Sequence, residues 1–465
     1  MGEKKKARKS LSSFSIILII LAVLCLATYL IPDVTNASLS DFLMAPVRGF
    51  ADAMDVCIFV LVLGGFLQII TKTGALDAGI AVLVKKMKGN ELILIPILMT
   101  LFSIGGSTYG MLEETVPFYL LLAATMVAAG FDSVVGAAVV LLGAGSGVLG
   151  STVNPFAVGA ALDSAGIEMN QGLIIGIGAL LWITTLIISI TFVMRYAKKV
   201  KADKGSTILS LQEQKDMQAT FVDKEVKSDD VKLTGTQKTV LWLFAFTFVV
   251  MVIGFIPWWS FNITIFDGWS GILTGMNFGD WYFQETAGWF LLMAIIIGLV
   301  ARMSEKDIVN EFIKGAGDMM SVVLIIAISR GASVIMTSTG LHIWILENAA
   351  NLLAGVSAII FAPLAYLLHV FLSVLVPSSS GLAGLSMPIM APLAEKLAFS
   401  PEVMLMTFVA GNGLVNLITP TCGAIMGGLA IAHIEYSTWV KFATKIVVTI
   451  AIVNIVILTV AMMLL

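Results

Sequence analysis

Charged residues are scarce in this sequence. Only 12% of its 465 residues are Asp, Glu, Lys or Arg, while 58% are hydrophobic. Soluble domains are on average about one quarter charged. Many apolar runs reach the roughly 20 residues that a helix needs to cross the hydrocarbon core of a bilayer. The composition therefore predicts an all-α polytopic membrane protein and excludes an ordinary soluble domain.

Cysteine and catalytic motifs are scarce as well. Cys25, Cys57 and Cys422 lie in apolar stretches without CxxC or Cys/His spacing, so neither a disulfide framework nor a metal site is indicated. The sequence contains no Walker loop, dinucleotide fingerprint, nucleophile elbow or HExxH motif. ATP-driven transport and hydrolytic catalysis therefore have no support. We expect no catalytic residues, no organic cofactor and no nucleic-acid partner.

A polar, glycine-broken stretch occurs twice within otherwise apolar surroundings. Residues 105–117 read GGSTYGMLEETVP and residues 377–388 read PSSSGLAGLSMP. An offset of 271 aligns Ser107 with Ser378. Secondary transporters build binding sites near the membrane midplane from interrupted helices in repeated halves of the chain. The duplication therefore predicts two related halves with a binding site between them.

Basic flanks set the predicted orientation, because cytoplasmic loops carry an excess of Lys and Arg. KKKARK at residues 4–9, the lysines within residues 85–88 and RYAKKVKADK at residues 195–204 are all expected on the cytoplasmic side. This assignment closes only if residues 91–129 enter and leave the membrane on one side, as a re-entrant hairpin. We therefore predict a protein of the inner (cytoplasmic) cell membrane whose N-terminus is cytoplasmic and whose first helix is retained.

Two inverted-topology repeats joined by a linker follow from this count. Asp52 and Asp318 mark mates at an offset of 266, and an extra helix near residues 286–301, without a counterpart in the first half, would make the mates run in opposite directions. The predicted parts are a first repeat at 1–195 with a hairpin at about 91–129 and a broken helix at about 131–165, a solvated cytoplasmic linker at 196–237, and a second repeat at 238–465 with a hairpin at about 357–398 and a broken helix at about 402–433.

Each predicted hairpin tip holds small hydroxyl residues and a glycine just before a half-helix. The free N–H groups and positive dipole end of a half-helix suit a carboxylate, and nearby carbonyl oxygens suit a cation. Close helix packing is the alternative use of such residues, but their repetition favours a substrate site. The candidates are Ser107, Thr108 and Gly110 in the first tip, and Ser378, Ser379, Ser380 and Gly381 in the second.

The two predicted broken helices repeat the same logic. A Gly-Ser-Gly or Gly-Asn-Gly triplet precedes a proline in each, and a proline exposes the carbonyl one turn before it. Neighbouring side chains that simply satisfy the kink are the alternative. The candidates for binding substrate are Asn154, Asn412, Asn416 and Thr419, and those for binding a coupling Na⁺ are Ser146, Asn154, Asn412 and Thr419. H⁺ is the alternative coupling ion.

Three charges fall within apolar segments. A carboxylate near the bilayer centre costs about 2.5–3.5 kcal/mol, so Glu113 and Glu114 are functional candidates by default. They exceed what a helix start capped by Gly110 needs, and we expect one acid to cap while the other faces a cavity. Arg330 either binds a substrate carboxylate bidentately or pairs with an acid such as Glu113. The sequence leaves both roles open.

The segments GSTYGMLEETVPFY (106–119) and GNGLVNLITPTCG (411–423) resemble the YfcC-type carriers of the family named for the C4-dicarboxylate anaerobic carrier DcuC. The resemblance runs through both halves and omits the linker. It implies the ion-transporter superfamily fold, a homodimer with scaffold and transport domains, and an elevator-type motion. It also implies substrate and ion sites at the hairpin tips and broken helices. Related branches include arginine/ornithine antiporters, and others carry dicarboxylates.

The residues favour a basic amino acid over a dicarboxylate. Two acids and one arginine suit a substrate that carries positive charge together with a carboxylate, whereas a dianion would avoid nearby carboxylates. We therefore predict a secondary transporter for amino-acid-like solutes that works by alternating access, with an arginine/ornithine-type antiporter as the leading hypothesis. The alternatives are a Na⁺- or H⁺-coupled carrier of C4-dicarboxylates or other carboxylates, a symporter of neutral amino acids or peptides, and a channel-like or sensory membrane protein.

Overall fold

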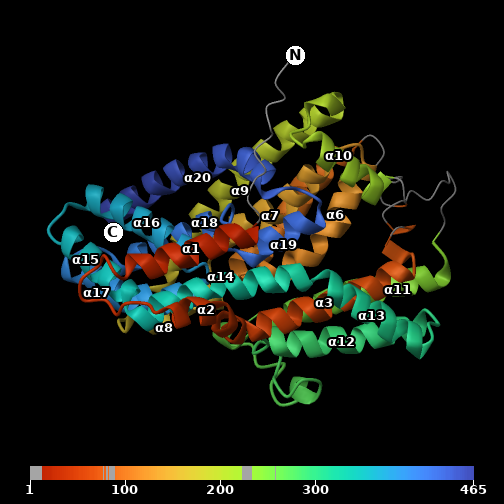
Figure 1. The fold of residues 1–465 in the computed structure, drawn as a ribbon, viewed down its shortest axis with the longest axis horizontal. Helices are drawn as coiled ribbons and strands as arrows, with labels where there is room; N and C mark the ends of the chain where they lie inside the picture. Colours follow the sequence, from red (N-terminus) through yellow and green to blue (C-terminus); the bar gives the residue numbers. More distant parts are fainter. Residues whose placement is uncertain (1–12, 77, 80–81, 83–89, 223–232, 257) are drawn as a thin grey trace.

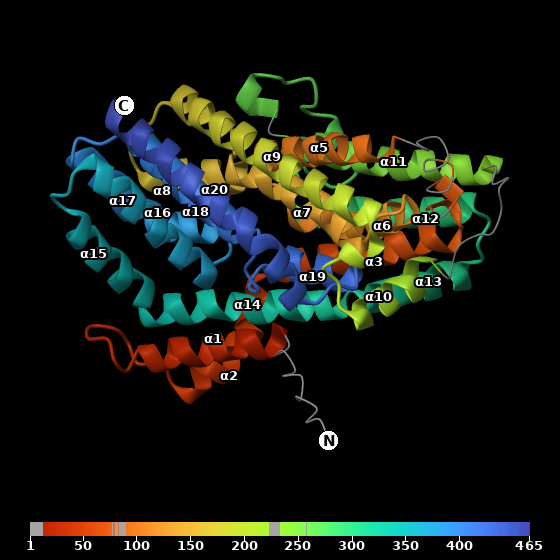
Figure 2. The same cartoon turned by 90° about the horizontal axis from the view of Figure 1, so that it is seen from above.

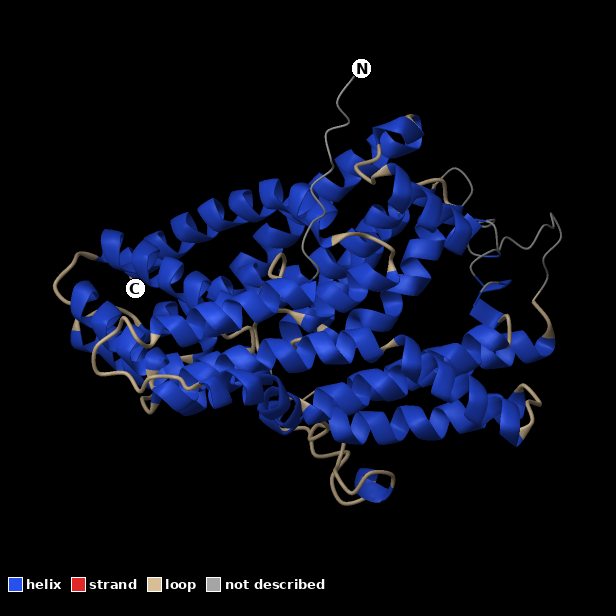
Figure 3. Cartoon of the chain, in the orientation of Figure 1, coloured by secondary structure: helices blue, strands red, loops and turns tan. Residues whose placement is uncertain are grey.

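Helices make up most of the described chain (Figures 1 and 3). The computed structural model describes residues 13–76, 78–79, 82, 90–222, 233–256 and 258–465, and no strand occurs among them. Eight helices in this described part are long and apolar enough to cross a membrane. The predicted basic flanks at 4–9 and 85–88, and residues 223–232 of the predicted linker, lie outside the described residues.

The described residues before the long α9 include seven α-helices. They are α1 (Ser13–Ala27), α2 (Leu39–Asp52), α3 (Met54–Lys72), α5 (Leu94–Tyr109), α6 (Val116–Ala128), α7 (Ser133–Leu149) and α8 (Ala160–Ala165). Helix α9 (Gln171–Ala202) and the short α10 (Leu211–Met217) follow.

The second part begins at α11 and ends with another long helix, α20. Its helices are α11 (Gly235–Phe255), α12 (Phe283–Val300), α13 (Glu305–Asp318), α14 (Met320–Thr339), α15 (Leu341–Leu353), α16 (Ala358–Leu375), α17 (Ser379–Lys396), α18 (Pro401–Val415), α19 (Gly423–Ile431) and α20 (Tyr436–Leu464).

Helices from the two parts of the chain exchange partners. The amphipathic α2 packs against α14, and the amphipathic α13 packs against α3. Helix α1 lies on α14 and α12 on α3, as Figure 2 shows from above. Glycine permits these close crossings, because a methyl group on Gly49 of α2 would lie 2.3 Å from the carbonyl oxygen of Ala327 in α14.

The most deeply buried helices are α7 and α18, which contact each other at the centre of the protein. Helices α5 and α6 pack on α7, while α16 and α17 pack on α18. Small residues bring the first of these pairs together, since a methyl group on Gly147 would lie 2.0 Å from the carbonyl oxygen of Ser103. Each hairpin is therefore held against the helix that follows it in the chain.

The predicted linker is anchored over much of its length. Helix α9 continues to Ala202, so the basic stretch after residue 195 is helical. Glu213 of α10 then accepts hydrogen bonds from the backbone N–H of Glu435 (2.8 Å) and from Thr438 Oγ1 (3.0 Å). These bonds satisfy donors at the start of α20, where helices leave N–H groups without intrahelical partners. The described segment up to Val222 thus belongs to the folded body.

Candidate functional site

The first hairpin tip is bonded to the break in the helix that follows it. Ser107 Oγ donates to the carbonyl oxygen of Gly150 at 3.1 Å and lies 3.1 Å from Thr152 Oγ1. The N–H of Thr152 donates back to the carbonyl oxygen of Ser107 at 2.9 Å. Asn154 begins the next half-helix, because its Oδ1 accepts the N–H of Phe156 at 2.9 Å. The first tip and first break are therefore locked into one unit.

Gly110 has a different role from the predicted one. It ends α5 in the left-handed conformation with φ of 81°, which glycine adopts without strain, and its N–H donates to the carbonyl oxygen of Gly106. It therefore closes the first arm of the hairpin and does not cap the second. A methyl group at Gly110 would lie 2.6 Å from Asn154 Oδ1, so the residue also allows the tip to approach the break.

The second tip and second break are joined through side chains. Ser379 Oγ donates to Asn412 Oδ1 at 2.7 Å, and Asn416 Nδ2 donates to the same oxygen at 3.2 Å. Asn416 Nδ2 also lies 3.4 Å from the carbonyl oxygen of Pro377 in the tip. The Oδ1 of Asn416 is buried and has no hydrogen-bond partner within the described part of the chain. This break therefore keeps one unused oxygen ligand.

The second break continues with two threonines. Thr419 Oγ1 lies 2.7 Å from Thr421 Oγ1, and Thr421 Oγ1 donates to the carbonyl oxygen of Val374 at 3.0 Å. Two residues later Gly423 begins α19. Cys422 and Gly423, at the positive end of the α19 dipole, line a cavity together with Glu113 and Ser378.

A small cavity of about 40 Å³ lies where α14, the turn after the first tip, the second tip and the second break meet. A water molecule needs about 10–15 Å³ of such space, so in this conformation the cavity has room for a few water molecules or an ion and is too small for an amino acid. The residues that line it are Val56, Glu113, Ile326, Ser329, Arg330, Pro377, Ser378, Thr421, Cys422 and Gly423.

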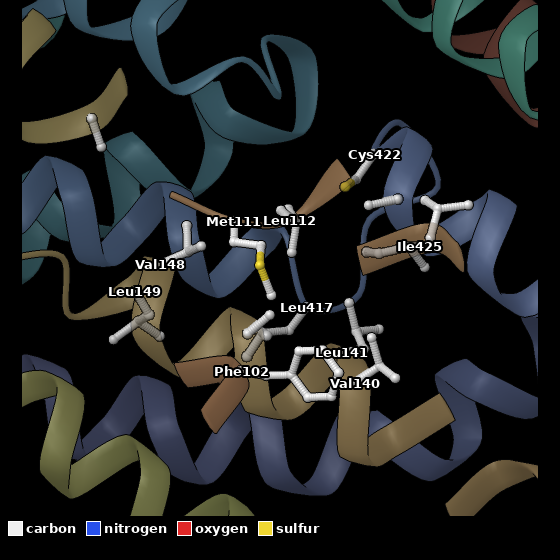
Figure 4. Close-up of a cluster of buried hydrophobic side chains, with 14 of the residues drawn as sticks. Phe102, Met111, Leu112, Val140, Leu141, Val148, Leu149, Leu417, Cys422 and Ile425 are labelled. Carbon is white, nitrogen blue, oxygen red and sulfur yellow. The ribbon is translucent and has the colours of Figure 1, made fainter. Parts of the chain in front are cut away.

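The two adjacent acids occupy different environments. Glu114 is buried, and its Oε2 accepts the N–H of Leu112 at 3.0 Å, so it stabilises the turn before α6. Glu113 lines the cavity. Figure 4 shows the apolar layer beneath this turn, where Met111 and Leu112 pack near Leu417 and Cys422 of the second break. The first tip therefore reaches the second break and presents Glu113 there.

Arg330 contributes the positive charge of the cavity. Its Nε lies 3.7 Å from Asp52 Oδ2 at the end of α2, and 24% of its side chain is exposed. A methyl group on Gly381 would lie 3.9 Å from Arg330 Nη1, which places the guanidinium beside the first turn of α17. The ion pair is with Asp52 and not with Glu113. At this length and exposure it contributes little stability.

The structure divides the predicted site residues into two groups. Glu113, Arg330 and Ser378 line one cavity, and Ser379, Ser380, Gly381, Asn412, Asn416 and Thr419 belong to the tip and break beside it. Ser107, Thr108, Gly110, Ser146 and Asn154 instead hold the first tip and first broken helix together or bond within them. Ser146, for example, donates to the carbonyl oxygen of Leu142 in its own helix.

Sequence reasoning did not assign Asp52, Ser329 or Thr421 to the site. Asp52 carried a signal, since it stands at a repeated position as the mate of Asp318, and the repeat was taken as a topological marker only. Thr421 lies just beyond the Thr-Pro pair of the second break. Ser329 precedes Arg330 and gave no pattern of its own.

The family model described as "C4-dicarboxylate anaerobic carrier" (DcuC) matches residues 10–463. A relative from Haemophilus influenzae described as an "Uncharacterized protein" is 31% identical over 420 residues, which cover 90% of this chain and 78% of the relative. The protein described as "Putative basic amino acid antiporter YfcC" from Escherichia coli is 28% identical over 410 residues, covering 84% of this chain and 74% of that protein.

Two solved structures also align along almost the whole chain. One is MtrF of Neisseria gonorrhoeae, described as illuminating "a Class of Antimetabolite Efflux Pumps". It aligns with a TM-score of 0.46, 16% identity and coverage of 99% of this chain and 96% of the other. The YdaH transporter of Alcanivorax borkumensis aligns with a TM-score of 0.46, 13% identity and coverage of 96% and 97%.

Proposed function

Because the chain belongs to the C4-dicarboxylate anaerobic carrier (DcuC) family of membrane transporters, we propose that it is a secondary transporter that exchanges basic amino acids by alternating access. It is a multi-pass membrane protein with eight helices of spanning length among its described residues. The basic residues near the end of α9 and the start of α20 favour a cytoplasmic location for that end of both helices.

The observation that carries this proposal is that Glu113 and Arg330 line the same cavity. An amino acid presents a carboxylate and an ammonium group a few ångströms apart. Arg330 and the free N–H groups at the start of α17 suit the carboxylate, and Glu113 suits a cationic group of the substrate. Of the two adjacent acids, Glu113 is the one available to the substrate, because Glu114 accepts a backbone N–H of its own turn.

Asp52 adds a second acid at the edge of this cavity. Its ion pair with Arg330 is long and more than half of its side chain is exposed, so a substrate carboxylate can compete with it for the guanidinium. In the substrate-bound state, Asp52 is then available to a second positive charge. This supports a basic amino acid over a neutral one. The name of the YfcC relative points in the same direction.

Transport requires the cavity to enlarge. At about 40 Å³ it cannot enclose an amino acid, so substrate entry must separate the second tip from α14 or from the second break. The second tip suits such a movement, because Ser380 and Gly381 are exposed there while Ser107 of the first tip is fully buried. We infer that the second hairpin opens the site and that the first hairpin moves with the broken helices.

Internal symmetry supports this architecture. The helix-capping pair Ser38 and Asp41 at the start of α2 recurs as Ser304 and Asp307 at the start of α13, at the same offset of 266. Reciprocal packing of α2 on α14 and of α13 on α3 is the pattern that two-fold-related elements produce. In membrane transporters such an axis lies in the membrane plane when the repeats are inverted.

The same contacts revise which helix stands outside the repeat. The sequence suggested that the helix near residues 286–301 has no counterpart. Helix α12, however, packs on α3 as α1 packs on α14, and each precedes an amphipathic helix with the repeated cap. We therefore assign α12 as the mate of α1, which leaves α11 as the unmatched helix. An elevator-type movement of the hairpins and broken helices against the remaining helices is our proposal on this basis.

A coupling ion is the second element of the proposal. The Oδ1 atoms of Asn154 and Asn412, two predicted ligands, already accept hydrogen bonds from protein donors. The unused buried oxygen is Asn416 Oδ1, which lies in the break whose residues line the cavity. Unwound backbone carbonyls supply Na⁺ ligands in other secondary transporters. If exchange is ion-dependent, we propose Na⁺ at this break.

Purified protein in liposomes tests the function. We expect saturable uptake of labelled arginine that rises when the liposomes contain ornithine or arginine. Succinate and neutral amino acids, Na⁺ gradients and pH gradients form the rest of the panel. Saturable succinate uptake without any response to arginine would refute the exchanger and favour the carboxylate carrier, for which Arg330 beside a helix N-terminus is the structural support. Flux independent of internal solute would indicate a channel.

A further inference from the structure

A groove of about 930 Å³ lies between the C-terminal half of α9 and the N-terminal half of α20. It is formed by the last turns of α9, the segment after α9 and the first turns of α20. The C-terminal end of α9 and the N-terminal end of α20 therefore lie together at the groove. The site residues Glu113, Arg330 and Ser378 do not line it.

Four cations converge on this groove. Arg195 and Lys199 lie one turn apart on α9, and Lys441 and Lys445 lie one turn apart on α20. All four are exposed, and none forms an ion pair within 4.0 Å among the described residues. Like charges at a spacing of four residues repel each other. Among the described residues, the electrostatic interaction of Lys199 with Asp203 therefore compensates this positive charge in part, and no ion pair does so.

The acids nearest to the groove are committed elsewhere. Asp132 accepts hydrogen bonds from Tyr196 Oη and Thr207 Oγ1, both at 2.6 Å. Asp203, one turn beyond Lys199, accepts from Ser206 Oγ at 2.8 Å and from the N–H of Gly205 at 2.9 Å. These bonds lower the pKa of Asp203 and fix its carboxylate in the turn after α9. No acid belongs to the groove lining.

Apolar side chains continue the groove away from the cations. Ile187, Ile188 and Phe192 extend it along α9, and Ile446 extends it along α20. Both helices are spanning candidates of which only about a third of the apolar window is buried in the protein, 33% for α9 and 39% for α20. The trough therefore faces hydrocarbon, while its charged end lies where helix ends meet the polar headgroups.

We propose that this groove binds an anionic phospholipid, with the phosphate held by Arg195, Lys199, Lys441 and Lys445 and an acyl chain along the apolar trough. Scattered basic residues at cytoplasmic helix ends need no ligand, since they set orientation. Here, however, the cations come from two helices, meet in one hollow and adjoin an apolar trough, which is the arrangement that basic pockets between membrane helices use for lipid headgroups. A soluble anion would use the charges and leave the trough unused.

Bound lipid would join the two parts of the chain. Helix α9 belongs to the first part and α20 to the second, and they contact each other directly. Neutralising four cations between them removes a repulsion that otherwise opposes this contact. The lipid site rests on the membrane location of the protein and not on the proposed substrate, so either conclusion can fail without the other.

Native mass spectrometry of the purified full chain tests the site. Protein is released from nanodiscs that contain equal amounts of dioleoylphosphatidylglycerol and dioleoylphosphatidylcholine. Each surface cation raises the affinity for anionic lipid about fivefold. The double variant Lys441→Gln/Lys445→Gln is therefore expected to weaken retention of phosphatidylglycerol about 25-fold. The matched control Lys306→Gln/Lys314→Gln removes two exposed cations of α13 and is expected to retain lipid like the unmodified chain.

A conservative variant guards against misfolding as the cause of lipid loss. Lys441→Arg/Lys445→Arg keeps both charges and is expected to restore retention, and thermal unfolding with added phosphatidylglycerol should follow the same order of variants. Equal retention of the two lipids, or equal retention by the glutamine variant and the control, would overturn the proposal. Stabilisation of the same size by inorganic phosphate alone would also overturn it and would identify the groove as a soluble-anion site. If the glutamine variant loses a dimer and not bound lipid, the groove is a contact between two copies of the chain.

Discussion

Glu113→Gln and Glu114→Gln separate the two roles that the structure gives to adjacent acids. Glu113 lines the cavity with Arg330, whereas Glu114 accepts the backbone N–H of Leu112. A hydrogen bond to a charged group contributes about 1.5–3 kcal/mol, and about 1.4 kcal/mol corresponds to a tenfold change in an equilibrium constant. Loss of the Glu113 charge should therefore raise the KM for arginine about 10- to 150-fold.

Glu114→Gln should leave the KM for arginine nearly unchanged. The amide oxygen of glutamine can accept the same N–H of Leu112, so the turn before α6 keeps its hydrogen bond. We expect a modest loss of thermal stability, about 1 kcal/mol for one weakened buried bond. The assay is initial-rate uptake of labelled arginine into ornithine-loaded liposomes, with equal amounts of inserted protein confirmed for each variant.

A panel of substrates identifies which positive charge Glu113 binds. If it binds the α-ammonium group, Glu113→Gln lowers the affinity for every transported amino acid alike. If it binds the side-chain cation, only basic amino acids are affected and the preference for them over neutral ones disappears. The reasoning is refuted if both glutamine variants behave like the unmodified protein, or if Glu114→Gln causes the larger loss.

Three further substitutions probe other contacts. Arg330→Lys keeps the charge but removes the planar fork that binds a carboxylate bidentately, so the KM for arginine in the same uptake assay should rise about tenfold, and an unchanged KM would remove Arg330 from substrate binding. Gly147→Ala places a methyl group 2.0 Å from the carbonyl oxygen of Ser103 and should lower the stability by about 1–3 kcal/mol in thermal unfolding. Glu213→Ala deprives the start of α20 of its acceptor and should cost about 1 kcal/mol in the same measurement, while Lys215→Ala on the exposed side of α10 should not.

More of the helix arrangement than of the site chemistry could be predicted from the sequence. Long apolar runs and basic flanks report on spanning helices directly, because the bilayer sets their length. The duplicated Ser/Thr-Gly stretches likewise marked the two interrupted segments, which the structure places at Gly110 and at Val376–Ser378. Composition and spacing therefore predict features that belong to a single segment, such as a spanning helix or an interruption within it.

What the sequence could not supply is contact between segments. The repeat aligned Ser107 with Ser378, yet the first is buried against Gly150 while the second lines the cavity. Similar residues acquire different roles because the surroundings of the two tips differ. The ion pair of Arg330 with Asp52 joins residues 278 positions apart (330 minus 52), and no local pattern encodes such a pair. The proposed change of the unmatched helix from α12 to α11 has the same origin, since it rests on packing partners and not on length and order.

The asymmetry between the two tips indicates how a duplicated structure obtains a one-sided site. The first tip is fixed to its broken helix by hydrogen bonds of Ser107 and Thr152 and by the close approach of Gly110 to Asn154. It can therefore present Glu113 at a constant position. The second tip keeps an exposed first turn of α17 beside Arg330. Ser378 at the start of this turn lines the cavity, and its Oγ accepts the N–H of Gly381. We therefore propose that Glu113 on the rigid side selects for positive charge and that Arg330, beside the second tip, captures the carboxylate. On this proposal, closure of the second hairpin completes the site only when both charges of the substrate are present.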